Sequence, residues 1–69
     1  MKISARNQLK GKVTEIKEGA VNGVVAIDIG GGNIVSAVIT MDSIKRLDLK
    51  VGSEAYAVIK ASSVMIAVD

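Results

Sequence analysis

Hydrophobic and polar side chains alternate along most of this chain, and a period of two is typical of β-strands that bury one face. Valine and isoleucine dominate the apolar positions, and glycines separate the apolar runs, which also favours an all-β protein. We therefore predict five strands, at residues 4–16, 24–29, 34–39, 55–60 and 64–68.

The connections between these strands carry turn signals. The run Gly30-Gly31-Gly32-Asn33 predicts a hairpin between the second and third strands, because glycine and asparagine tolerate positive φ. Gly11 lies inside the long first strand, where we expect it to provide a kink or a bulge. Further turns are expected at residues 17–20, 50–53 and 61–63.

The period changes after the third strand, where Met41, Ile44 and Leu47 recur every three residues and predict a short helix. Thr40 or Asp42 is placed to cap its first turn. Five strands with one short helix between the third and the fourth match a small OB-like barrel. A small open β-sandwich fits this order of elements almost as well.

The composition points to self-association. The chain has 69 residues, 49% of them hydrophobic, and it contains neither cysteine nor histidine. A single domain of this length, residues 1–69, buries only about 60% of its unfolded surface. Because disulfides and the usual zinc ligand sets are excluded, docking of further copies is the remaining way to stabilise the fold. We therefore expect an obligate homo-oligomer.

The chain lacks the sequence features of membrane insertion and export. No apolar run approaches the roughly 20 residues that span a bilayer. The N-terminal residues Met1-Lys2-Ile3-Ser4 are not followed by the apolar core of a signal peptide. We expect a cytoplasmic protein without a membrane partner.

Catalysis is not expected, and no catalytic residue is assigned. General acid–base chemistry needs paired titrating groups, but Asp28, Asp42 and Asp48 fall on different predicted elements. A serine nucleophile would lack a partner base. The glycine run at residues 30–32 leads from strand to strand and has no lysine, unlike a phosphate-binding loop.

Nucleic-acid binding has mixed support. OB domains that bind single strands stack bases on aromatic side chains, and Tyr56 is the only aromatic residue of this chain. The net charge of +2 is mild. A basic cluster near the N-terminus keeps a nucleic-acid-binding OB module as an alternative, although a solvated strand face explains it more simply; its members are Lys2, Arg6, Lys10 and Lys12.

Several hydrogen-bond donors fall at predicted strand ends or at the helix start, namely Ser4, Arg6, Thr40, Ser43 and Lys60. Cationic groups, hydroxyls and early helix amides together suit a tetrahedral oxyanion. Each hydrogen bond to a charged group contributes about 1.5–3 kcal/mol, so several donors, from two chains at a subunit interface, can offset desolvation. The same residues are also explained as strand starts, a helix cap and a turn flank.

Two segments of the chain resemble the molbindins, the small molybdenum-pterin-binding (Mop) proteins. They are residues 4–11, SARNQLKG, and residues 58–66, VIKASSVMI, and the likeness extends over essentially the whole chain. Molbindins consist of a single transport-associated OB domain, which also occurs in molybdate-responsive regulators and importer ATPases. The resemblance implies a cytoplasmic molybdate- or tungstate-binding hexamer, a trimer of dimers, with oxyanion sites at its subunit interfaces.

The resemblance also implies site residues. Ser4, the backbone of Ala5, and Arg6 are expected to contact the anion. The other segments associated with this site correspond to Thr40, Ser43, Lys60 and Ala61. A second kind of site near the threefold axis is assigned to a turn that contains Lys17, Gly19, Ala20 and Asn22.

The expected function is reversible storage or buffering of molybdate as part of metal homeostasis. The anion's own oxygens face the protein, so no direct metal ligand and no catalytic cofactor is expected, and nothing in the sequence builds an aromatic slot for a pterin. Tungstate has nearly the same size and charge, whereas sulfate is smaller. The alternatives are a binder of sulfate or phosphate, a nucleic-acid-binding OB module, and a purely structural assembly module.

Overall fold

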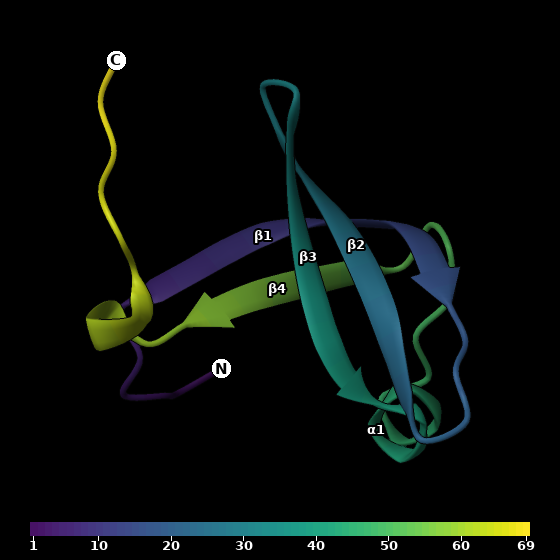
Figure 1. The fold of residues 1–69 in the computed structure, drawn as a ribbon. Helices are drawn as coiled ribbons and strands as arrows, with labels where there is room; N and C mark the ends of the chain where they lie inside the picture. The colour runs from purple at the N-terminus through teal and green to yellow at the C-terminus, as the bar shows by residue number, and fades with distance from the viewer.

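Four antiparallel strands form one curled sheet in the computed structural model, which describes residues 1–69. The strands follow the order β3-β2-β1-β4 across the sheet, and the β2–β3 hairpin crosses over the β1–β4 pair (Figure 1). The bounds are β1 (Asn7–Lys17), β2 (Asn22–Gly30), β3 (Asn33–Thr40) and β4 (Glu54–Ile59). The helix α1 (Met41–Arg46) separates β3 from β4, and a 3₁₀ turn, η1 (Ala61–Ser63), follows β4. The chain contains no helix with the length and hydrophobicity that crossing a bilayer requires.

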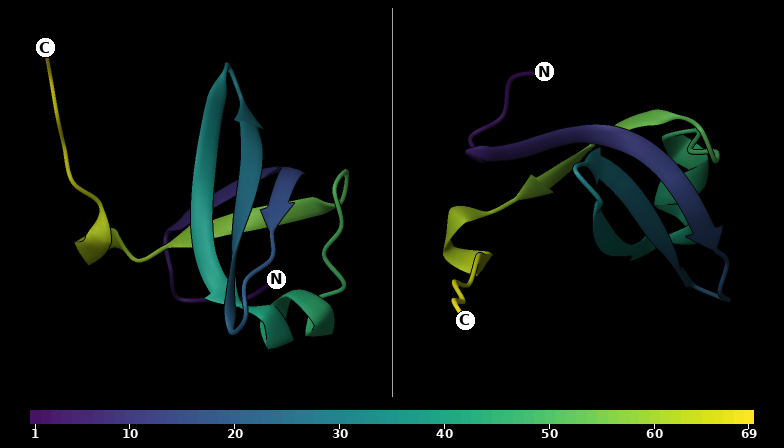
Figure 2. Two further views of the ribbon diagram at one scale, coloured as in Figure 1. Left: turned by 45° about the vertical axis from the view of Figure 1, so that its right-hand side comes forward. Right: turned by 90° about the horizontal axis from the view of Figure 1, so that it is seen from above.

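Strand β1 joins the two halves of the sheet. Its first part pairs with β4, from Asn7 opposite Ile59, and its second part pairs with β2 as the strand curves (Figure 2). The ladder shifts between Val13 and Glu15, so the expected irregularity is not at Gly11. Gly11 serves a different purpose, because a Cβ there would overlap the neighbouring β2 backbone. The two strands can approach closely only because this residue has no side chain.

The predicted glycine hairpin is confirmed. Gly30 pairs with Asn33, and the two residues between them form the turn. Gly31 and Gly32 both have positive φ, at 63° and 79°. Such a pair of angles is the signature of a type I′ turn, whose twist matches the twist of the flanking strands.

The core inside the curl is very small. Only seven of the 69 residues are buried, and none of the buried residues is polar or charged. The helix contributes Ile44 to this core, whereas Leu47 at the next predicted apolar position is 61% exposed. Much of the apolar surface of this chain therefore remains uncovered in a single copy. The central cluster consists of Val13, Val25, Ile27, Ile44 and Ala57.

The prediction of a fifth strand at residues 64–68 is wrong for the isolated chain. This segment leaves η1 and runs away from the sheet without a neighbouring strand (Figures 1 and 2). Its side chains face solvent, with Met65 92% and Ile66 87% exposed. Alternating or apolar composition favours a strand, but a strand forms only where backbone groups find a partner, and here none lies within reach. The all-β class is confirmed as a curled four-stranded sheet, and the closed five-stranded barrel is not.

Thr40 is the N-cap of α1, and of the two predicted candidates, Thr40 and Asp42, the first is therefore confirmed. Its Oγ1 accepts a hydrogen bond from the Ser43 N–H at 3.0 Å, and its backbone is extended, as is typical of an N-cap.

Replacing Thr40 with alanine is expected to lower the free energy of unfolding by about 1 kcal/mol. Urea denaturation at one fixed protein concentration measures this change. Thr40→Ser retains the acceptor and should recover most of the loss, and an alanine variant as stable as the parent would contradict the capping role.

Candidate functional site

The N-terminal segment and the turn that follows β4 line a pocket of about 360 Å³. The pairing of Asn7 with Ile59 brings these two distant segments together, and Asn7 Nδ2 donates to the Ile59 carbonyl at 3.1 Å. The turn η1 then folds the chain beside the start of β1 (Figure 1). The lining consists of Ser4, Ala5, Arg6, Lys60, Ala61 and Ser62.

The pocket carries positive charge that nothing in the chain neutralises. Arg6 and Lys60 line it, no carboxylate does, and neither cation forms an ion pair. The hydroxyls of Ser4 and Ser62 have no partner among the side-chain hydrogen bonds of the chain either. Two cationic side chains and two hydroxyls therefore remain free to donate to a small anion.

Five of the seven residues predicted for the first site line this pocket, and two do not. Thr40 and Ser43 lie at the start of α1, where their hydroxyls are hydrogen-bonded to each other at 2.8 Å. The structure adds Ser62, which sequence reasoning left out. Its position next to Lys60 and Ala61 in a predicted turn was the signal that could have identified it.

The residues predicted for the second site lie in and beside the connection between β1 and β2. All four are exposed, and they line none of the three cavities of the chain. One copy therefore does not form a site there. These residues are Lys17, Gly19, Ala20 and Asn22.

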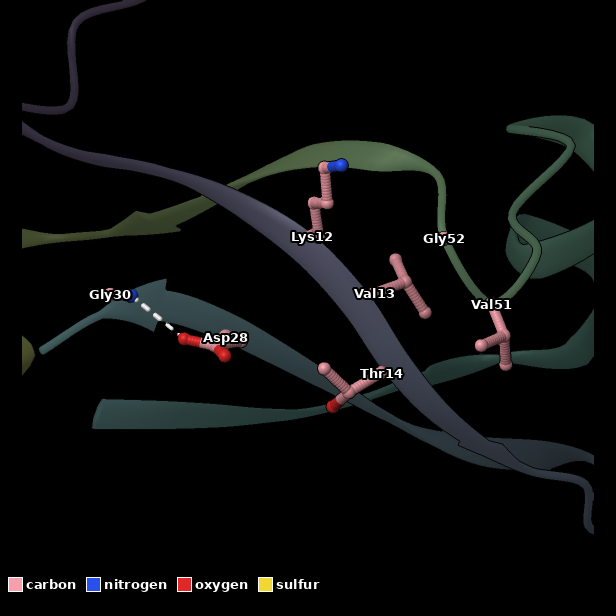
Figure 3. Close-up of a pocket in the computed structure, with 7 residues that line it drawn as sticks. All are labelled: Lys12, Val13, Thr14, Asp28, Gly30, Val51 and Gly52. Atoms are coloured by element: carbon pink, nitrogen blue, oxygen red, sulfur yellow. Dashed lines mark hydrogen bonds between the residues drawn. The ribbon is translucent and has the colours of Figure 1, made fainter. Parts of the chain in front are cut away.

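Two further cavities differ chemically from the Ser4–Ser62 pocket. One of about 500 Å³ presents Lys12 and Asp28 together, and Asp28 Oδ1 accepts from the Gly30 N–H at 2.8 Å (Figure 3). Its opposite charges do not favour a dianion. The other, of about 340 Å³, is lined almost entirely by apolar residues, Leu47, Leu49 and Tyr56 among them, and Glu54 is its one charged member.

The TOBE domain model matches residues 3–66 of this chain. A curled β-domain of this length with this match belongs to the TOBE domain family. Within that family, the chain is a molbindin-type (Mop) protein, as its relatives show. A probable molybdenum-pterin-binding protein from Haemophilus influenzae is 61% identical to it over 69 residues, which is the full length of both chains.

Solved structures agree with this family assignment. MopII from Clostridium pasteurianum superposes with a TM-score of 0.91 at 48% identity, covering 97% of this chain and 100% of MopII. The cytoplasmic molybdate-binding protein ModG, solved with molybdate bound, gives a TM-score of 0.90 at 43% identity. That match covers 94% of this chain and 46% of ModG. The resemblance inferred from residues 4–11 and 58–66 is thereby confirmed.

Proposed function

We propose that this protein reversibly binds molybdate, and tungstate in the same way, and thereby stores or buffers the anion in the cytoplasm. The observation that carries this proposal is a pocket with two unpaired cations, two free hydroxyls and no carboxylate. Relatives whose names state molybdenum-pterin or molybdate binding support molybdate as the anion. No step of this function requires catalysis.

The residues of the pocket contribute to anion binding in two different ways. Arg6 and Lys60 supply charge, and charge-assisted hydrogen bonds are about twice as strong as neutral ones. The Ser4 and Ser62 hydroxyls, with the backbone at Ala5 and Ala61, supply shape. We assign Thr40 and Ser43, which lie outside this pocket, to the part of the site that a neighbouring copy completes.

Assembly follows from the uncovered segment at the C-terminus. Residues 64–68 are apolar and exposed, and both edge strands of the sheet, β3 and β4, lack a partner on one side. We propose that this segment pairs with the sheet of another copy and supplies the missing fifth strand. A hexamer built from such dimers would also bring copies of the residue 17–22 turn together around a threefold axis, as the second site requires.

Titration of one preparation with molybdate, tungstate and sulfate tests the proposal. Molybdate and tungstate should bind with similar affinity, because their size and charge are nearly equal. Sulfate should bind more weakly, because a smaller anion cannot reach all the donors at good hydrogen-bond distance. Calorimetry at constant ionic strength measures the three affinities, and sulfate binding as tight as molybdate would count against the assignment.

Two rivals are tested by separate measurements. The nucleic-acid alternative is weakened because Lys10 pairs with Glu54 at 3.5 Å, and Tyr56 has no aromatic neighbour to form a stacking platform. A gel-shift series at several salt concentrations should show no binding. A purely structural module would contain no molybdenum when purified from cells grown with molybdate, so elemental analysis separates it from an anion store.

A further inference from the structure

Several carbonyl groups of the two segments that form the Ser4–Ser62 pocket already accept hydrogen bonds within the chain. Two of them are satisfied by amide side chains from the first strand. Gln8 Nε2 donates to the Ala5 carbonyl at 2.8 Å, and Asn7 Nδ2 donates to the Ile59 carbonyl at 3.1 Å. Each of the two segments that form the pocket therefore has one carbonyl that already accepts a hydrogen bond from a side chain of β1.

The turn η1 engages two more carbonyls in its own hydrogen bonds. The Ser63 N–H donates to the Lys60 carbonyl at 2.8 Å, and the Val64 N–H donates to the Ala61 carbonyl at 3.3 Å. Both acceptors belong to residues that line the pocket. Four backbone carbonyls of the two pocket-forming segments therefore already accept a hydrogen bond from within the chain.

The side chains of the pocket reinforce this bias toward donors. Arg6 and Lys60 can only donate, and no aspartate or glutamate lines the pocket. The hydroxyls of Ser4 and Ser62 are the remaining side-chain acceptors, and each can turn its proton toward an anion. A ligand whose oxygens only accept hydrogen bonds can pair with all four of these side chains at once.

Resting on the function proposed above, we propose that the pocket selects oxyanions by their protonation state as well as by their size. It accepts fully deprotonated tetrahedral dianions and rejects dianions that keep a proton near neutral pH, such as hydrogen phosphate and hydrogen arsenate. The O–H of such an anion is a donor; among the side chains of the pocket, Arg6 and Lys60 can only donate, and only the two serine hydroxyls can accept from it. A protonated anion binds less tightly when its hydroxyl is left unpaired or is placed against another donor. A fully deprotonated anion does not carry this penalty.

Matched pairs of anions separate this effect from size. Selenate and hydrogen arsenate have the same charge at mildly alkaline pH and nearly the same dimensions, but only arsenate carries a proton. Each anion is used to displace molybdate from the full-length protein at constant ionic strength. We expect selenate to displace molybdate at about tenfold lower concentration than hydrogen arsenate, and sulfate to outcompete hydrogen phosphate in the same direction.

A positioning residue provides the second arm of the test. Gln8→Ala leaves the donors of the pocket in place and frees the Ala5 carbonyl to accept from a protonated anion. The selenate-to-arsenate ratio should therefore fall severalfold toward one. The matched control is Asn33→Ala, which removes a similar side-chain bond, to the Gly30 carbonyl, at the far hairpin and should leave the ratio unchanged.

The outcomes distinguish this inference from the function on which it rests. Failure of molybdate itself to bind would overturn the proposed function. Tight molybdate binding with equal competition by selenate and arsenate would overturn only the selection by protonation state. The same conclusion follows if neither anion competes up to its solubility limit, because the proton would then not be what excludes arsenate.

Discussion

Replacing Ile66 with aspartate is expected to convert the assembled protein into single copies. Ile66 is 87% exposed in the isolated chain and lies within the apolar segment at residues 64–68. Covering such a side chain stabilises an interface by about 1.5–3 kcal/mol, and a carboxylate at the same place would instead lose its hydration. Because every copy carries the change, the penalty is repeated at each interface of the assembly.

Sedimentation equilibrium at micromolar concentration measures this effect. Ile66→Val keeps an apolar, β-branched side chain and should preserve the mass of the assembly. Lys45→Ala, on the exposed side of α1, lowers the net charge by one, as Ile66→Asp does, and controls for that change. An aspartate variant at position 66 with the mass of the parent would show that this segment does not join the copies, and a monomeric parent would refute self-association itself.

Replacing Arg6 with alanine should weaken molybdate binding by about 1.5–3 kcal/mol, which is roughly 10- to 150-fold in the dissociation constant. The change removes a charged donor whose only role in the structure is to line the pocket, since Arg6 forms no ion pair in the chain. The fold should therefore be unaffected. The loss should appear in one class of site if the assembly holds two.

The chain supplies its own control for this experiment. Arg46, the other arginine, lies in the last turn of α1 and away from the pocket, so Arg46→Ala makes the same change in net charge. Calorimetric titration of both variants, with thermal unfolding of the unliganded proteins alongside, separates lost binding from lost stability. Equal affinity of the Arg6 variant and its parent at every site would remove Arg6 from the binding mechanism.

The sequence predicted the strands that have both a buried face and a partner within the chain. Alternation located β2, β3 and β4 to within two residues, because each strand turns every second side chain toward the small core. The first strand was predicted from residue 4, but pairing begins at Asn7 opposite Ile59. The segment at residues 64–68 has the composition of a strand, and composition does not say whether the partner belongs to the same chain.

The candidate site was predictable in its chemistry and only partly in its geometry. Donor types identified Ser4, Arg6 and Lys60, and the structure places all three in one pocket. Their meeting depends on the register between β1 and β4, which a hydrophobic pattern does not define. Thr40 and Ser43 were predicted from the same donor logic, but within one chain their hydroxyls bond to each other, and the Thr40 hydroxyl also caps α1.

One short turn belongs to two parts of this molecule. Ala61 and Ser62 of η1 line the Ser4–Ser62 pocket, and the exposed segment at residues 64–68 starts directly after η1. If that segment docks on another copy, anion binding and oligomerisation are thermodynamically linked. An anion that stabilises the oligomer then binds more tightly to the oligomer than to the single copy, by the same free energy. The capacity to retain the guest would then rise and fall with the abundance of the protein itself.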